Sequence, residues 1–517
     1  MKHQFISKSQ VSKMAVTHLN KNMMKNNIAN ILIFSFILCM SFSCSSSDDA
    51  ELTEPPTDNS GTGSGAVGDP QTDYDILVRN PVIQTWYTPD PAPMVYKDTL
   101  FLFVDHDEDD ADYFKMKDWQ LYSTTDMINW TYRGTPMTTA TFAWANQGDK
   151  AWAAQAIEHN GKFYWYMCAQ DAQTGADVIG VAVADSPVGP YRDARGEPLA
   201  PATWGYIDPS VFIDDDGQAY LFWGNNNLWY AELSTDMISF EGDIHQVNVM
   251  DESAFGPIIR TKNDDGSITQ KTNYEEGSWV YKRNGIYYLL YAAGGIPEYM
   301  AYSTATDIAG PWKYQGRIMD SAEQSFTIHG GNVDFKGRHF MFYHNGILPN
   351  GGGFRRSTCV EEFSFTSDGR IPFMHFTETS IRKSVGTLNP CERVEAETMA
   401  WSEGLKTDRT IGHHHYVTSI HNGDYLKVSA VQFAGKEYSK FSACVAATKS
   451  GGRIEVRIGS RTGPLLAKLE VTSTGAMDAW QDLSVDVNRQ ENGLCDLYFV
   501  FLGDEGELFN VDYWQFK

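Results

Sequence analysis

Short runs in which hydrophobic and polar residues alternate, separated by tight turns, cover residues 76–385. Five units within this segment repeat the same order of strand, turn residue and aromatic-rich strand. They begin at Asp90, Ala153, Asp208, Glu276 and His329, and their turn residues are Asp98, Gly161, Gly217, Gly285 and Gly337. Such units are unable to bury both of their faces alone, and a spacing of roughly 50–70 residues is typical of β-propellers. The pattern predicts an all-β fold in which residues 76–385 form a five-bladed β-propeller.

Residues 391–517 also alternate between hydrophobic and polar positions, for example in Arg453–Ile458 and Asp496–Phe501. The length of this segment and its short strands are typical of a β-sandwich. The sequence therefore predicts two folded domains, a propeller and a C-terminal β-sandwich of the jelly-roll type.

The N-terminal part differs in composition from both predicted domains. Lys21–Lys25 is basic, Ile28–Met40 is apolar, and Cys44 follows closely. An apolar run this short is typical of a secretion signal rather than of a membrane span. It resembles a bacterial lipoprotein signal in which Cys44 carries the lipid. We therefore expect a signal peptide over 1–44, a flexible linker over 45–75, and a protein anchored at the outer membrane or cell surface of a Gram-negative bacterium.

The charge of the chain limits its partners. The formal net charge is −25 at pH 7, which opposes binding to nucleic acid and to anionic membrane surfaces. The lipid at Cys44 is the only membrane contact that we expect.

Four of the five repeated units begin with an acidic residue or a histidine: Asp90, Asp208, Glu276 and His329. Radial repeats place equivalent positions around one axis, so these side chains are expected to converge. Hydrolysis of a glycosidic bond needs one carboxylic acid at the leaving oxygen and one carboxylate that activates water. A third carboxylate can keep the acid protonated by charge repulsion. Aspartate is also common in turns without any function, as in Asp214–Asp216, so this prediction depends on the matching positions in the repeat.

Residues 76–385 resemble glycoside hydrolase family 43. The resemblance lies in Thr88–Pro93 (TPDPAP), Asp208–Ser210 (DPS), Glu276–Gly277 with Tyr281–Gly285 (YKRNG), and His329–Gly331 (HGG). It implies that Asp90 is the general base, Glu276 the general acid, and Asp208 the residue that orients the acid and modulates its pKa. It also implies that His329 helps to hold a central calcium ion, and that hydrolysis inverts the anomeric configuration.

Four further positions bear on this site. Glu275 precedes Glu276, and neighbouring strand residues face opposite sides, so only one of them points inward; the Glu-Gly pair favours Glu276. Trp152 precedes the second hairpin, where the family often places a pocket aromatic, although core packing is the alternative. Arg356 follows the fifth hairpin and is a candidate contact for sugar hydroxyls. Arg355 is an equal candidate, and a surface arginine is the alternative for both.

The resemblance also indicates a substrate class. Family 43 enzymes mostly remove α-L-arabinofuranosyl or β-D-xylosyl units from plant cell-wall polysaccharides, and residues 80–130 look most like arabinofuranosidase and xylosidase members. We expect an exo-acting α-L-arabinofuranosidase that acts on arabinoxylan or arabinan. The alternatives are a β-xylosidase that acts on xylo-oligosaccharides, an endo-acting arabinanase, and a non-catalytic glycan-binding lipoprotein. Retention of all three carboxylates argues against the last of these.

The C-terminal segment, 391–517, resembles a family 6 carbohydrate-binding module. The matching pieces are Val394–Glu397 (VEAE), Asn422–Leu426 (NGDYL) and Phe509–Trp514 (FNVDYW). The resemblance implies that Glu395, Glu397 and Asp512 help to hold a structural calcium ion, which prefers oxygen ligands. It also implies that Asn510 contacts the bound sugar.

The binding cleft of this module departs from the family pattern. Such modules usually hold a sugar between two aromatic side chains, and here Ser419 and Met477 stand at those positions. Loss of both stacking faces would remove much of the binding energy. A structural domain that supports the propeller is therefore the alternative to a sugar-binding module.

Overall fold

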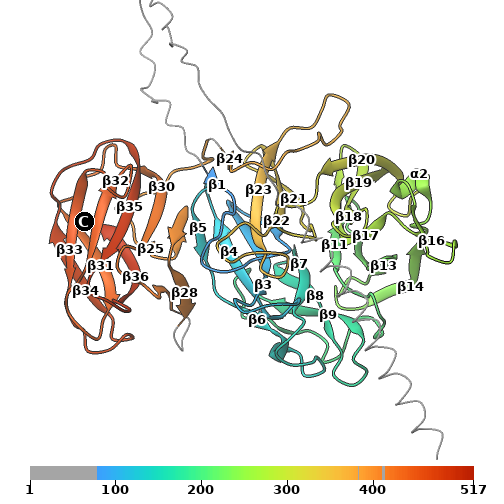
Figure 1. The fold of residues 1–517 in the computed structure, drawn as a ribbon, viewed down its shortest axis with the longest axis horizontal. Helices are drawn as coiled ribbons and strands as arrows, with labels where there is room; N and C mark the ends of the chain where they lie inside the picture. The colour runs from blue at the N-terminus through green and yellow to red at the C-terminus, as the bar shows by residue number, and fades with distance from the viewer. Residues whose placement is uncertain (1–77, 382, 410–413) are drawn as a thin grey trace, which may run out of the picture. The chain divides into compact units, whose positions relative to one another are not determined.

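The regular structure of the computed structural model consists almost wholly of β-strands, which confirms the all-β prediction (Figure 1). Helical structure within the described part is limited to η1 (Thr139–Thr141) and α2 (Glu252–Phe255). No helix in that part is long and apolar enough to cross a membrane. The structure describes residues 78–381, 383–409 and 414–517, so the predicted signal peptide and linker, with Cys44, lie outside the described residues.

Five antiparallel sheets follow one another along the first part of the chain, each with its strands in chain order. The first contains β2 (Ala92–Tyr96), β3 (Thr99–Asp107), β4 (Met116–Thr124), β5 (Trp130–Tyr132) and β6 (Met137–Thr138). The second contains β7 (Trp152–His159), β8 (Lys162–Gln170), β9 (Asp177–Ala184) and β10 (Arg192–Asp193), and the third β11 (Ser210–Ile213), β12 (Ala219–Trp223), β13 (Leu228–Leu233) and β14 (Phe240–Val247). The fourth contains β17 (Tyr274–Arg283), β18 (Ile286–Ala293), β19 (Tyr299–Ala305) and β20 (Lys313–Met319), and the fifth β21 (Asn332–Phe335), β22 (Arg338–Asn345) and β23 (Ser357–Phe363).

Each predicted hairpin is present as the first strand pair of its sheet. In four of them the predicted turn residue has a φ between 75° and 89°; these are Gly161, Gly217, Gly285 and Gly337. A β-carbon is strained in this region, so glycine closes the turn with the least strain. In the first hairpin Lys97 takes the left-handed conformation, with φ 55°, next to the predicted Asp98.

The first strands of neighbouring sheets lie against one another. β7 contacts β2 and β11, β11 contacts β17, and β2 contacts β21. Gly331, just before β21, is so close to β17 that a β-carbon there would lie 2.3 Å from the Trp279 ring. The starts of these first strands are therefore grouped. Asp90, Asp208 and His329 lie just before such strands, and Glu276 lies within β17.

Two short strand pairs lie outside the five sheets. β15 (Ile259–Lys262) and β16 (Ile268–Lys271) form a separate hairpin between the third and fourth sheets. β1 (Val78–Arg79) pairs with β24 (Thr379–Ile381), which joins the beginning of this segment to its end.

The C-terminal segment contains two further antiparallel sheets. One has six strands, namely β25 (Val394–Glu395), β28 (Lys406–Arg409), β29 (His415–Thr418), β31 (Lys440–Ala446), β34 (Gln481–Asp486) and β36 (Asn510–Phe516). The other has five, namely β27 (Trp401–Glu403), β30 (Tyr425–Gln432), β32 (Gly452–Ile458), β33 (Leu465–Val471) and β35 (Leu494–Leu502). Side chains of both sheets form one buried core, in which Phe499 of β35 packs against Trp514 of β36.

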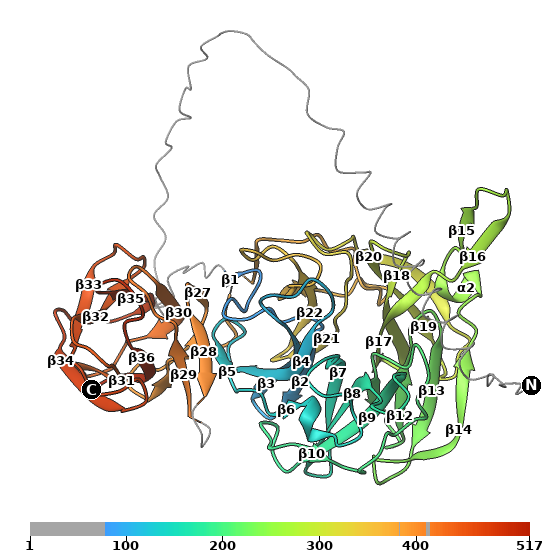
Figure 2. The same ribbon diagram turned by 60° about the horizontal axis from the view of Figure 1, so that its bottom comes forward.

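The C-terminal segment is joined to the first sheet by a shared strand. β26 (Thr398–Met399) pairs with β5 and extends that sheet. In Figure 2, β5 lies at the edge of the hydrolase segment beside the C-terminal strands β27 and β28. Beside this strand, the Asn129 side chain accepts a hydrogen bond from the Ser429 backbone N–H at 2.9 Å and donates one to its carbonyl at 2.8 Å. Backbone pairing and a buried amide thus fix the contact between the two segments.

Candidate active site

The structure brings the four predicted residues together. His329 Nδ1 lies 3.5 Å from Asp90 Oδ1 and 4.0 Å from Asp208 Oδ2. The same Asp208 oxygen accepts a hydrogen bond from the Gly277 N–H at 3.0 Å, directly after Glu276. Residues that lead into three of the first strands, together with one of those strands, β17, therefore share one small volume.

Asp90 and Asp208 have the same unusual backbone. Their φ angles are 54° and 58°, and each residue precedes a proline that leads into the first strand of a sheet. A left-handed backbone is uncommon for residues other than glycine, and aspartate tolerates it better than most. Strained residues of this kind cluster at functional sites. The repeat thus places two carboxylates in equivalent positions at the cost of local strain.

Asp90 is buried beside a fixed cation. Arg356 Nη1 lies 3.3 Å from Asp90 Oδ1, and the rest of the guanidinium binds both oxygens of Asp107, at 3.0 and 3.1 Å. Burial alone would raise the pKa of Asp90, but Arg356, then His344 and His329, outweigh it and hold the pKa below its usual range. Asp90 is therefore ionised at neutral pH, which suits a general base.

His344, at the end of β22, fixes the Asp90 backbone. Its Nε2 lies 3.0 Å from the Thr327 carbonyl, which only accepts, so this nitrogen carries the proton. Its Nδ1 then accepts the Asp90 backbone N–H at 3.2 Å. No motif in the sequence pointed to this histidine, because its role depends on a contact between the first and fifth sheets.

A second buried carboxyl group, Asp105, lies beside Asp90. Burial and the charge of Asp90 raise the pKa of Asp105 well above its usual value. Asp105 and Asp107 lie near the end of β3, where the pairing with β4 is irregular, and both carboxyl groups lie near Arg356. Two buried aspartates near the end of a largely apolar strand could have been noticed in the sequence.

Glu276 has the protonation behaviour of an acid. Burial raises the pKa of Glu276 to about 7, opposed by a hydrogen bond from Asn225 and supported by the charge of Asp90. Asn225 Nδ2 donates to Glu276 Oε2 at 2.6 Å. Burial, followed by the charges of Glu276 and Asp90, also raises the pKa of Asp208. A proton is therefore available beside Asp90 near neutral pH.

Glu275 makes different contacts from Glu276. Its Oε2 is ion-paired with Lys271 at 2.6 Å, and the residue is buried. The carboxyl group of Glu276 is thus the one that binds Asn225 and whose pKa is raised by the charge of Asp90. This agrees with the choice of Glu276 that the Glu-Gly pair favours.

Of the two adjacent arginines, only Arg356 reaches the centre. It is 3% exposed and bound by Asp107, so the surface-arginine alternative is wrong for this residue. Arg355 instead donates to the backbone carbonyls of Ala111 and Asn350.

Trp152 is half-buried rather than open to solvent. Its Nε1 donates to the Phe114 carbonyl at 3.1 Å, and the Lys150 ammonium lies 4.9 Å from its ring. Its ring also packs against two hydrophobic clusters, which gives Trp152 a part in the core.

The sequence analysis missed an aromatic cluster next to Arg356. Phe114, Phe326 and Phe354 are half-buried and meet edge to face, with ring centres 5.0 to 5.9 Å apart. The Arg356 guanidinium lies 5.0 Å from the Phe114 ring. These rings come from three separate loops, and their positions in the sequence gave no sign that they meet.

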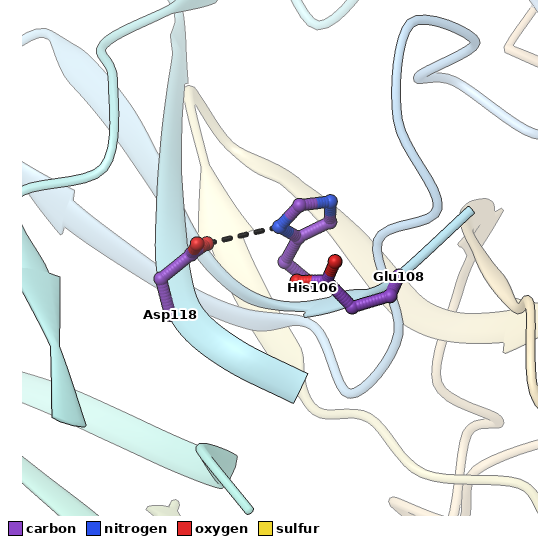
Figure 3. Close-up of side chains that lie close together, drawn as sticks. All are labelled: His106, Glu108 and Asp118. Atoms are coloured by element: carbon purple, nitrogen blue, oxygen red, sulfur yellow. Dashed lines mark hydrogen bonds and ion pairs between the residues drawn. The ribbon is translucent and has the colours of Figure 1, made fainter. Parts of the chain in front are cut away.

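The described residues contain one group of three side chains close enough to share a metal ion: His106, Glu108 and Asp118 (Figure 3). His106 Nδ1 lies 3.0 Å from Asp118, and Lys117 binds Glu108 at 2.7 Å. These partners already satisfy the charges of the group. None of the four predicted metal ligands belongs to it.

The predicted calcium ligands in the C-terminal segment, Glu395, Glu397 and Asp512, are only partly occupied by other partners. Arg393 binds Glu395 at 2.8 Å and lies 3.4 Å from Asp512. Glu397 is buried, and its Oε2 has no hydrogen-bond partner among the described residues. Burial raises the pKa of Glu397 to about 8, with the charges of Glu395 and Asp512 adding to the effect. An unpartnered buried oxygen beside two more carboxylates fits the donor chemistry of calcium.

Asn510, the predicted sugar contact of that segment, is buried. Its Nδ2 donates to the Met477 carbonyl at 2.8 Å, while its Oδ1 has no partner among the described residues. Trp480 lies three residues after Met477 and packs edge to face on Tyr416, with ring centres 5.2 Å apart.

Family models match the chain in two places. The model described as Glycosyl hydrolases family 43 matches residues 78–371, and the one described as Carbohydrate binding module (family 6) matches residues 395–517. The chain belongs to glycosyl hydrolase family 43. This family 43 member is therefore a glycoside hydrolase, and it carries a family 6 module after its hydrolase segment.

Relatives differ in how much of this family 43 chain they share. An arabinoxylan arabinofuranohydrolase of Paenibacillus polymyxa is 31% identical over 84% of this chain and 74% of its own. A crystal structure of a family 43 arabinoxylan arabinofuranohydrolase from Bacillus subtilis, in complex with cellotetraose, matches with a TM-score of 0.71 and 28% identity, over 85% of this chain and 99% of that chain. A xylosidase/arabinosidase of Bacteroides ovatus is 31% identical but shares 55% of this chain and 94% of its own.

Proposed function

We propose that this family 43 hydrolase is an exo-acting, inverting α-L-arabinofuranosidase that removes arabinofuranosyl branches from plant hemicellulose such as arabinoxylan or arabinan. The observation that carries the proposal is the convergence of Asp90, Asp208 and Glu276. Both aspartates lie within 4.0 Å of His329, Asp208 accepts a hydrogen bond from the residue after Glu276, and Asp90 contacts the buried Arg356. The two relatives that match both segments are named arabinoxylan arabinofuranohydrolases, and this supports a branched xylan as the substrate.

Asp90 acts as the base. Arg356 and the Asp90 backbone contact to His344 hold its carboxylate ionised and in place. A water between Asp90 and the anomeric carbon loses its proton to this carboxylate as it attacks, which inverts the configuration. Arg356 is itself held by Asp107. We therefore propose that it positions Asp90 and binds the sugar only through guanidinium N–H groups that Asp107 does not occupy.

Glu276 acts as the acid and donates its proton to the leaving oxygen. Its raised pKa leaves a protonated fraction at neutral pH, and Asn225 directs its carboxyl group through a 2.6 Å hydrogen bond. Asp208 accepts a hydrogen bond from the N–H of Gly277, the residue after Glu276, and so fixes the backbone that carries the acid. The charge of Glu276 in turn opposes ionisation of Asp208.

We further propose that the five sheets are the blades of a propeller over residues 76–385, and that the two C-terminal sheets form a β-sandwich over 391–517. The contacts between the first strands of neighbouring sheets support the first proposal. The core shared by the two C-terminal sheets supports the second.

Calcium remains part of the proposal. Glu395, Glu397 and Asp512 would hold a structural ion through their oxygens, as the unpartnered Glu397 Oε2 supports. The fit is weaker at His329, because Arg356 already lies against the Asp90 oxygen that faces this histidine. No catalytic step described above depends on a metal.

We also propose that the protein is exported and held at the surface of a Gram-negative cell by a lipid on Cys44. The basic residues, the short apolar run and the cysteine that follows it support this location. Labelling of cells with radioactive palmitate, with Cys44→Ala as the control, tests it.

The direct test of function is NMR-monitored hydrolysis of wheat arabinoxylan, with Glu276→Ala in parallel. We expect arabinose to appear first in the β configuration, and only with the unchanged protein. Release of xylose without arabinose would contradict the proposal in favour of a β-xylosidase. Release of no sugar at all would favour a glycan-binding protein.

A further inference from the structure

A cleft with a volume of about 650 Å³ lies between the hydrolase segment and the C-terminal segment. Volumes of this size are typical of ligand sites. Aromatic rings line it from both sides: Trp86 and Tyr87 precede β2, and Trp401 begins β27. Leu348 and Leu405 add apolar surface. The cleft is therefore an open site that neither segment could form alone.

Side-chain contacts across the boundary hold the two walls in register. Trp86 Nε1 donates to Thr407 Oγ1 at 2.9 Å, and Lys406 is ion-paired with Asp109 at 2.8 Å. The Lys406 ammonium also lies 4.2 Å from the Trp86 ring. The rings are thus presented at fixed positions, which limits the entropy lost when a ligand binds.

The cleft begins next to the catalytic centre. Tyr87 lies three residues before Asp90, and its carbonyl accepts the Asp107 backbone N–H at 3.1 Å. The carboxylate of Asp107 holds Arg356, which in turn contacts Asp90. One chain of direct contacts therefore connects the cleft wall to the proposed base.

The chemistry of the cleft selects a neutral ligand. The three charged residues that line it are already paired: Asp109 with Lys406 at 2.8 Å, and Glu403 with Arg461 at 3.7 Å. Aromatic faces beside hydrogen-bonding groups suit pyranose rings, which present C–H faces and hydroxyl edges. A charged oligomer would find no free counter-charge here.

We propose that this cleft binds the unbranched, neutral pyranose main chain of the polysaccharide, while the branch sugar enters the centre at Asp90 and Glu276. The inference rests on the proposed function for the identity of the branch. It assigns the C-terminal segment a role in substrate binding that depends on Trp401, apart from the predicted cleft at Asn510.

Binding is measured on the full chain carrying Glu276→Gln, titrated calorimetrically with xylohexaose. Adding Trp401→Ala is expected to raise the dissociation constant about five- to tenfold, because a stacking face is lost. Trp401→Phe is expected to restore most of the affinity. Phe373→Ala serves as the matched control, because Phe373 is an exposed aromatic residue that does not line the cleft.

Kinetics with otherwise unchanged protein provide the second readout. Trp401→Ala is expected to raise KM for arabinoxylan at least fivefold more than KM for 4-nitrophenyl α-L-arabinofuranoside. Equal effects on both substrates, or unchanged affinity for xylohexaose in a variant of normal melting temperature, would overturn the inference. So would loss of xylohexaose binding with Asn510→Ala but not with Trp401→Ala.

The aryl substrate separates the two proposals. If the unchanged protein does not cleave it, the proposed arabinofuranosidase activity fails, while xylohexaose binding still reports on the cleft. If it cleaves the aryl substrate but the Trp401 variants bind xylohexaose normally, the activity stands and the cleft inference fails.

Discussion

In each segment several carboxyl groups lie beside one arginine, and the two sites differ in how this charge is balanced. In the hydrolase segment the balancing cation, Arg356, has a side chain 4% exposed and is held by Asp107 from behind. In the C-terminal segment Arg393 has a side chain 44% exposed and lies over the cluster from outside. A buried and fixed cation lowers the pKa of one carboxyl group relative to its neighbours. An exposed arginine can move away and be replaced by a metal ion. The same residue types therefore suit catalysis in one place and metal binding in the other.

The largest effect is expected from removing the base. Asp90→Asn should lower kcat on arabinoxylan about 10²- to 10⁴-fold, because the amide is unable to accept the proton of water. Asp216→Asn, in an exposed hairpin turn, is the matched control and should leave the rate within about twofold. Rates are measured as arabinose released per minute. A rate for Asp90→Asn within tenfold of the unchanged protein would exclude Asp90 as the base.

The two arginines should differ sharply in stability. Arg356→Met leaves two buried carboxylates without their cation and should lower the free energy of unfolding by about 3–5 kcal/mol. Arg393→Met removes a partly exposed partner and should cost less than about 1 kcal/mol. Urea denaturation followed by fluorescence measures both. Equal losses would show that the difference in burial does not matter.

The pH profile should reflect the acid alone near neutrality. The pKa of Glu276 is raised to about 7, so kcat/KM should fall above pH 7 as this group loses its proton. The hydrogen bond from Asn225 favours the ionised form, so Asn225→Ala should raise the pKa and move the alkaline limb to higher pH. The lowered pKa of Asp90 places the acidic limb well below the usual range of a carboxyl group. Movement of the alkaline limb to lower pH in Asn225→Ala would contradict this account.

The smallest effect is expected in the C-terminal cluster. Adding calcium after treatment with EDTA should raise the melting temperature by about 1 °C, the shift that ~1 kcal/mol produces in a chain of 517 residues. Glu397→Gln should abolish the difference between calcium and EDTA, and the exposed Glu392→Gln should preserve it. Identical melting curves with and without calcium would remove the ion from this site.

The hairpins and the convergence of Asp90, Asp208 and Glu276 could be predicted because their information is local and repeated. Strand alternation and a turn glycine lie within one unit, and a radial repeat then relates equivalent positions. The left-handed backbone at Asp90 and Asp208 could not be predicted in this way, since a residue before a proline normally favours an extended conformation.

The residues that surround the proposed catalytic groups could not be predicted from local patterns in the sequence. His344 and Asn225 act through residues on other sheets, so no spacing in the sequence marks them. The choice between Arg355 and Arg356 likewise depends on Asp107, about 250 residues away in the chain. Asp105 is different, because it lies two residues before Asp107 at the end of one strand, and the sequence shows this directly.

The strand β26 has a consequence for how this protein can be divided. Its backbone covers the outer edge of β5, and an open edge is a template for pairing with another molecule. A truncated hydrolase ending before Thr398 would present that edge, together with an Asn129 amide deprived of its Ser429 partner. The C-terminal segment thus covers a strand edge that would otherwise be open to pairing with another molecule.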